Sequence, residues 1–155
     1  MANLGKQFEE RFSSQFRKQF PKAFCYRLPD QMSGYSNSVT PCDFFCFVNG
    51  RFLMVETKVH LGNTINIRSD IPQFEYMKRY VGRPGIYPII VIWFIDHDKI
   101  VYVKEEDMID MVADGLKSVN ISRTSELEKY HVVEIPSEKA IKFMKSDFSV
   151  LSEIK

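Results

Sequence analysis

The sequence has little of what membrane proteins and disulfide-stabilised proteins need. It contains three cysteines, Cys25, Cys42 and Cys46, and an odd number in apolar surroundings argues against a disulfide framework. No stretch approaches the ~20 apolar residues of a membrane span, and the longest, residues 89–95, is typical of a buried strand. The N-terminus also lacks the apolar segment of a secretory signal. We therefore expect a cytoplasmic protein that does not associate with a membrane.

An excess of charge of one sign is also missing. The formal net charge is +1, with the basic excess in residues 1–100. This distribution is compatible with a nucleic-acid partner but does not demand one, because ordinary solvated charge explains it almost as well. The three histidines are too scattered to be nominated as metal ligands, and Cys42 and Cys46 would lie ~13 Å apart on a strand. With 155 residues, 45% of them hydrophobic, the chain can bury one core, so we expect one domain over residues 1–155.

The dipeptide Asn49-Gly50 predicts a tight hairpin, because both residue types tolerate the positive φ angles of a two-residue turn. With Val48 opposite Arg51, the register places Asp43 directly across from Glu56. Two such side chains have Cβ atoms roughly 4.5 to 5.5 Å apart on one face of the sheet. Lys58 projects from the same face because side chains alternate along a strand.

Two carboxylates held this close predict a cation site, and hard oxygen ligands suit Mg²⁺, for which Mn²⁺ can substitute. Such an ion lowers the pKa of a bound water and neutralises charge on a phosphate. Lys58 would orient or help deprotonate that water, or donate to the developing negative charge. The pattern therefore indicates phosphodiester hydrolysis. The alternative is that Glu-x-Lys simply ends an ordinary strand.

A first helix over residues 4–20 follows from Phe8, Phe12, Phe16 and Phe20, which recur at every fourth position. Glu9 lies inside this apolar stripe, where a carboxylate is costly unless it is paired or near a metal. Glu9 is thus a candidate third acid of the site. Placement at the edge of the stripe, or pairing with a lysine, explains it about as well.

The remaining periodicity predicts an α/β fold with a mixed central β-sheet flanked by helices on both faces. The expected elements are a strand over 23–27, the hairpin, a helix starting near Ser69-Asp70 with Pro72 in its first turn, a central strand over 87–95, its partner over 100–103, a helix over 105–115, a last strand over 131–135, and a closing helix after Pro136-Ser137.

Further candidates flank the acidic pair. Gln73 lies at the end of the predicted helix nearest the site and could hold a water or a phosphate oxygen. The residues expected to contact DNA are Arg27, Tyr35, Ser36, Ser38, Arg68 and Lys78. For any one of them, a solvated connector or an ordinary polar surface is an equally simple explanation.

Together, Asp43, Glu56 and Lys58, with Glu9 on a preceding helix, resemble the PD-(D/E)xK nuclease superfamily. Within it the chain is similar to the RecU-type Holliday junction resolvases and, more distantly, to the archaeal Hjc resolvases. The segment Ile71-Pro72-Gln73-Phe74-Glu75-Tyr76-Met77 occupies the place of that family's glutamine helix.

The resemblance implies a restriction-endonuclease-like fold and a Mg²⁺-dependent homodimer that nicks two strands of a four-way DNA junction. Glu9, Asp43 and Glu56 would then gather the metal, Lys58 would serve the attacking water, and Gln73 would support the site. The chain departs from the RecU pattern in having only residues 28–40 where that family carries a long basic stalk. Pro72 also stands where the family often has histidine, and Thr57 where it commonly has alanine. Two alternatives remain: another nuclease of the superfamily, restriction-like or acting in repair, and a non-catalytic factor that binds branched DNA.

Overall fold

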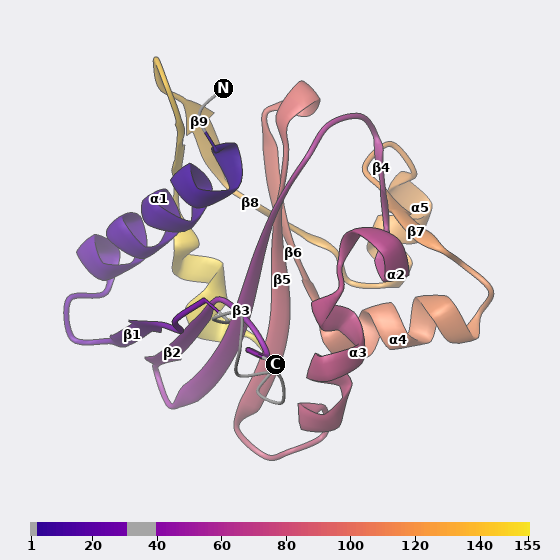
Figure 1. Cartoon of the computed structure of the whole chain (residues 1–155), viewed down its shortest axis with the longest axis horizontal. Coiled ribbons are helices and arrows are strands. Elements are labelled where there is room, and N and C mark those ends of the chain that lie inside the picture. The colour runs from indigo at the N-terminus through magenta and orange to yellow at the C-terminus, as the bar shows by residue number, and fades with distance from the viewer. Residues whose placement is uncertain (1–2, 31–39) are drawn as a thin grey trace.

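The computed structural model describes residues 3–30 and 40–155. Its centre is a six-stranded sheet in the order β1-β2-β3-β5-β6-β8. The strands are β1 (Phe24–Arg27), β2 (Phe44–Val48), β3 (Arg51–His60), β5 (Ile86–Phe94), β6 (Lys99–Lys104) and β8 (Val133–Ile135). β3 and β5 run parallel, and every other neighbouring pair is antiparallel. Helices lie on both sides of this sheet (Figure 1), so the predicted mixed α/β class is confirmed.

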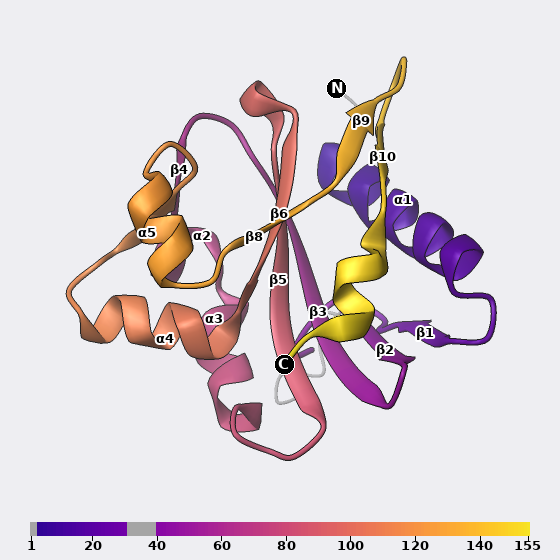
Figure 2. The ribbon, with the colours of Figure 1, turned by 180° about the vertical axis from the view of Figure 1, so that it is seen from behind.

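One face of the sheet is covered by α1 (Leu4–Gln19) and by the C-terminal 3₁₀ helix Phe148–Glu153, which lie on the same side of the sheet in Figure 2. The side chain of Asn3 caps α1 by accepting a hydrogen bond from the Lys6 N–H at 3.1 Å. Phe8, Phe12 and Phe16 are buried against the sheet. The spacing of the phenylalanines predicted this helix and its buried face, and both are confirmed.

The opposite face is covered by shorter helices. These are α2 (Ile67–Asp70), α3 (Gln73–Met77), the 3₁₀ helix Lys78–Tyr80, α4 (Glu105–Ala113) and α5 (Thr124–Lys129). The two strands β4 (Thr64–Asn66) and β7 (Ser118–Asn120) pair with each other on this side. None of the helices within residues 3–30 and 40–155 is long and apolar enough to cross a membrane.

Two predicted elements were wrong in detail. Instead of one helix starting near Ser69-Asp70, α2 ends at Asp70 and α3 begins at Gln73, with Pro72 at the N-cap position of α3. A proline has no N–H to continue a helix, so the chain restarts after it. The closing helix after Pro136-Ser137 is instead the hairpin of β9 (Ser137–Lys139) and β10 (Met144–Ser146), followed by the 3₁₀ helix.

The hairpin of β2 and β3 has the predicted register. The ladder pairs run from Val48↔Arg51 to Phe44↔Val55, and the turn residues Asn49 and Gly50 have φ angles of 50° and 76°. β3 lies between β2 and β5, well inside the sheet. Beyond Val55, Glu56 and Thr57 are buried, and residues 58–60 are partly exposed.

Candidate active site

The acidic pair lies where the β2–β3 ladder ends. Asp43 is one residue before β2, and its N–H donates to the carbonyl of Val55 at 3.0 Å. The simple register count predicted that Asp43 is the ladder partner of Glu56. This detail was wrong, because the ladder ends at the pair of Phe44 and Val55. The chain bends at this point, and the bend still brings both carboxylates to the same cleft.

This cleft of about 600 Å³ collects the five residues predicted to be catalytic from three separate parts of the fold. It is lined by Glu9 from α1, by Asp43, Glu56 and Lys58 from the hairpin, and by Gln73 from the start of α3. The residues contributed by α1 and α3 come from opposite faces of the sheet. The site therefore depends on the tertiary fold as well as on the hairpin.

Glu56 has the most strongly perturbed carboxylate of the site. Its side chain is only 2% exposed, and burial, with the nearby charge of Asp43, raises its pKa to about 9. Lys58 opposes this effect from 3.3 Å, the distance between its Nζ and Glu56 Oε2. The other oxygen, Oε1, is buried and has no hydrogen-bond partner within the described part of the chain. A buried carboxylate oxygen without a partner requires an explanation, and a ligand from the cleft is one.

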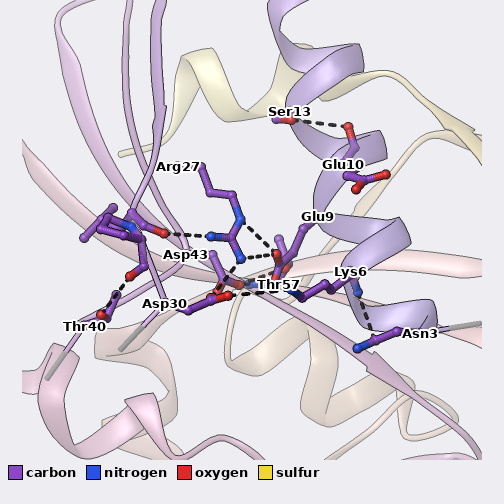
Figure 3. Close-up of polar contacts among 12 residues, drawn as sticks. Asn3, Lys6, Glu9, Glu10, Ser13, Arg27, Asp30, Thr40, Asp43 and Thr57 are labelled. Atoms are coloured by element: carbon purple, nitrogen blue, oxygen red, sulfur yellow. Dashed lines mark hydrogen bonds and ion pairs between the residues drawn. The ribbon is translucent and has the colours of Figure 1, made fainter. Parts of the chain in front are cut away.

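Asp43 is held on one side only. Its Oδ2 accepts hydrogen bonds from the N–H of Thr57 at 2.8 Å and from the hydroxyl of Thr57 at 2.9 Å (Figure 3). The backbone and the side chain of Thr57 therefore hold the same oxygen of the Asp43 carboxylate.

Glu9 points to the site, but an arginine occupies one of its oxygens. Arg27 donates from Nη2 and Nε to Glu9 Oε2 at 2.7 and 3.1 Å (Figure 3). Burial raises the pKa of Glu9, and the charge of Asp43 adds to this, whereas Arg27 counteracts both. The predicted alternative of a paired carboxylate is the arrangement found, although the partner is an arginine and not a lysine.

The donor set of the cleft fits a hard divalent cation. No group of three or more His, Cys, Asp or Glu side chains among residues 3–30 and 40–155 is arranged to hold a metal ion. Mg²⁺, however, is commonly bound by one or two carboxylates and completes its shell with waters and substrate phosphates. Asp43 and Glu56 meet that requirement, and the buried Oε1 of Gln73 also has no hydrogen-bond partner among the described residues. Amide and carboxylate oxygens are suitable ligands for such an ion.

The residues predicted to contact DNA are distributed around this site. Arg27 directs its remaining hydrogen bonds to Asp30 and to the carbonyl of Leu28. Arg68 and Lys78 both pair with Glu75, at 3.7 and 3.0 Å. Tyr35, Ser36 and Ser38 lie outside the described residues. DNA contact by any of these six residues remains a prediction.

Sequence reasoning missed two contacts that shape the site. No role was predicted for Thr57, yet its backbone N–H and its hydroxyl bind Asp43. Arg27 was expected to meet a phosphate, yet it binds Glu9. The only available signal was the buried-face position of Glu9, which requires a partner.

No family model and no curated protein matches the sequence. The solved structures similar to this chain include a resolvase and a viral nuclease. The first is the Hjc Holliday junction resolvase of Archaeoglobus fulgidus, with a TM-score of 0.48 and 13% identity over 66% of this chain and 78% of that one. The second is D212, a nuclease from a fusselovirus, with a TM-score of 0.35 and 10% identity over 83% of this chain and 89% of that one.

Neither likeness tests the RecU-type resemblance. At TM-scores below 0.5 both likenesses are distant. The function of this chain therefore has to be inferred from its own residues.

Proposed function

We propose that this protein is a divalent-metal-dependent DNA endonuclease that hydrolyses phosphodiester bonds and resolves four-way junctions. The observation that carries the proposal is the convergence of the Asp43 and Glu56 carboxylates in one cleft, with the ammonium group of Lys58 3.3 Å from Glu56. Two acids and a lysine in this arrangement are suited to attack by water on a phosphate.

Asp43 and Glu56 would hold the cation. When bound, Mg²⁺ acidifies a coordinated water and offsets charge on the phosphate. Burial and the nearby charge of Asp43 raise the pKa of Glu56 to about 9, so both disfavour its ionised form. A bound cation would favour the ionised form of Glu56, since metal ligands must be deprotonated.

Lys58 and Gln73 would act on the water and the phosphate. Lys58 is 24% exposed, so its ammonium group is accessible from the cleft. From there the ammonium group would orient the attacking water or donate to the negative charge that develops on the phosphate, whereas helping to deprotonate the water would require the neutral amine form of Lys58. Gln73 lies across the cleft on α3 and presents an unpartnered oxygen that supports the same water or the cation.

The choice of a four-way junction as substrate is supported by the resemblance of the residue set to the RecU-type and Hjc resolvases. A junction with two-fold symmetry that is cut at two points needs two related active sites, so the active form would be a homodimer. Other nucleases of the superfamily would use the same site on ordinary duplex or on DNA ends.

The test is cleavage of a four-way junction, a matched duplex and a single strand, each with Mg²⁺ and with EDTA. We expect Mg²⁺-dependent nicking of the junction in preference to the other two. Equal cleavage of all three would remove the resolvase assignment and leave a general nuclease. The Asp43→Asn protein should still bind the junction and should not cut it. Cleavage that persists in EDTA or in Asp43→Asn would contradict the proposed function itself.

A further inference from the structure

Thr57 lies between Glu56 and Lys58 in the sequence and contacts Asp43. The residue is only 7% exposed. Its backbone N–H and its hydroxyl both donate to the same oxygen, Asp43 Oδ2, at 2.8 and 2.9 Å (Figure 3). In a regular strand this side chain would face away from Glu56 and Lys58. It reaches Asp43 because Asp43 lies one residue beyond the end of the ladder, where the chain bends.

These contacts divide the four oxygens of the acidic pair into two classes. Asp43 Oδ2 is held by Thr57, and Glu56 Oε2 faces the ammonium group of Lys58. Glu56 Oε1 is buried without a hydrogen-bond partner among the described residues. Both donors of Thr57 are directed at Asp43 Oδ2, and neither is directed at Asp43 Oδ1. One oxygen of each acid is therefore anchored and the other is left for a ligand.

Anchoring matters because the carboxylate torsion of an aspartate is broad and roughly two-fold. Without a fixed donor, the carboxylate rotates and exchanges its two oxygens. Two hydrogen bonds from one residue to a charged acceptor hold a single orientation, because bonds to ionised groups are stronger than neutral ones. The backbone N–H stays with any substitution at position 57, but the hydroxyl depends on the side chain.

We propose that Thr57 is a positioning residue that fixes the Asp43 carboxylate so that Oδ1 faces Glu56 and, with Glu56 Oε1, forms the cation site. This inference rests on the proposed function, because it assigns a role within the same metal site. Thr57 acts through Asp43 and does not itself touch the cation or the phosphate. Its contribution is to metal affinity and not to the chemical step.

The test compares Thr57→Val, which removes the hydroxyl and keeps the branched shape, with Thr57→Ser, which keeps the hydroxyl and removes the methyl group. Thr64→Val serves as the matched control, since Thr64 is an exposed strand residue outside the cleft. Mn²⁺ binding is measured on each folded protein by calorimetry without DNA. Junction nicking is then measured against Mg²⁺ concentration.

We expect Thr57→Val to bind Mn²⁺ roughly tenfold more weakly, the effect of about 1.4 kcal/mol. It should need correspondingly more Mg²⁺ for half-maximal nicking, with a maximal rate within about threefold of the parent. Thr57→Ser and Thr64→Val should bind Mn²⁺ like the parent. Unchanged Mn²⁺ affinity in Thr57→Val, or an equal loss in Thr57→Ser, overturns the positioning role.

If Thr57→Val melts before it can be titrated, Thr57→Ala replaces it in the same comparison with Thr57→Ser. The proposed function is tested by the parent protein, independently of the Thr57 variants. If the parent protein neither binds Mn²⁺ nor cuts DNA, the nuclease assignment is wrong, whatever the variants at position 57 do. If the parent binds and cuts while the Thr57 variants equal it, only the role of Thr57 is wrong.

Discussion

Arg27 and Glu9 form a two-bond ion pair between β1 and α1, in which Nη2 and Nε of Arg27 lie 2.7 and 3.1 Å from the same Glu9 oxygen. The side chains are 34% and 18% exposed, so both are partly removed from water. The pair ties the helix to the edge strand of the sheet and turns the carboxylate of Glu9 towards the strand that carries Arg27. Glu9 therefore reaches the cleft as a paired group.

A double-mutant cycle measures this pair. We expect Arg27→Met and Glu9→Gln each to lower the free energy of unfolding, because each leaves its partner partly buried and without its counter-charge. The coupling between them should be about 1 kcal/mol, since partial exposure screens the charges. Urea unfolding of the two single variants and the double variant gives this number. The pair of Lys6 and Asp30, both more than 60% exposed at 3.7 Å, is the control and should show almost no coupling. A coupling near zero for Arg27 and Glu9 would mean that the contact does not stabilise the fold.

Substitution of Lys58 distinguishes an effect on metal binding from an effect on the chemical step. If it serves the attacking water or the developing charge, Lys58→Ala should lower the maximal nicking rate by roughly 10²- to 10⁴-fold. Mn²⁺ affinity should not fall, because the ammonium group repels a cation and is not one of its ligands. Calorimetry with Mn²⁺ and single-turnover nicking at saturating Mg²⁺ measure the two effects. Unchanged nicking would remove Lys58 from the mechanism.

Glu105 gives the fold a pH dependence that is independent of the site. It is fully buried at the start of α4, and neither of its carboxylate oxygens has a hydrogen-bond partner among the described residues. Burial raises its pKa from 4.5 to about 9, whereas the charge of Lys78 opposes the shift. The pKa of Glu105 is higher in the folded state than in the unfolded state. Below pH 4.5 its carboxyl group is neutral in both states and does not destabilise the fold. Stability is then lost as pH rises towards 9.

We therefore expect Glu105→Gln to be more stable than the parent at neutral and alkaline pH. The difference should grow by at most about 1.4 kcal/mol per pH unit between pH 5 and 9. Urea unfolding at several pH values measures it. Glu106→Gln, at the neighbouring position, is the control, because Glu106 is 53% exposed. Equal pH profiles for Glu105→Gln and the parent would show that the Glu105 carboxylate is not desolvated.

The sequence predicted the parts of this fold that depend on local signals. The Asn49-Gly50 turn fixed the register of its hairpin, and the period of the phenylalanines identified α1. The hairpin of β9 and β10 was not predicted, because its strands are short, largely polar and pair only with each other. Nothing in their pattern distinguishes them from a surface helix.

The residues that line the cleft were also predictable, whereas one of the contacts between them was not. The hairpin alone placed Asp43 near Glu56, and the cleft also brings in Glu9 and Gln73 as expected. The contact of Thr57 with Asp43 was not predictable, because it requires the chain to leave the ladder at Asp43. Regular strand geometry places the two side chains on different faces, and tertiary packing overrides it at this point.

The most direct measurement of the central claim is a crystal of the protein soaked with Mn²⁺ and examined by anomalous scattering. We expect one peak in the cleft, with a carboxylate oxygen of Asp43 and one of Glu56 each about 2.1 Å from the ion. Absence of a peak at saturating Mn²⁺, or a peak that contacts only one of these two acids, would contradict the claim that they form a shared cation site.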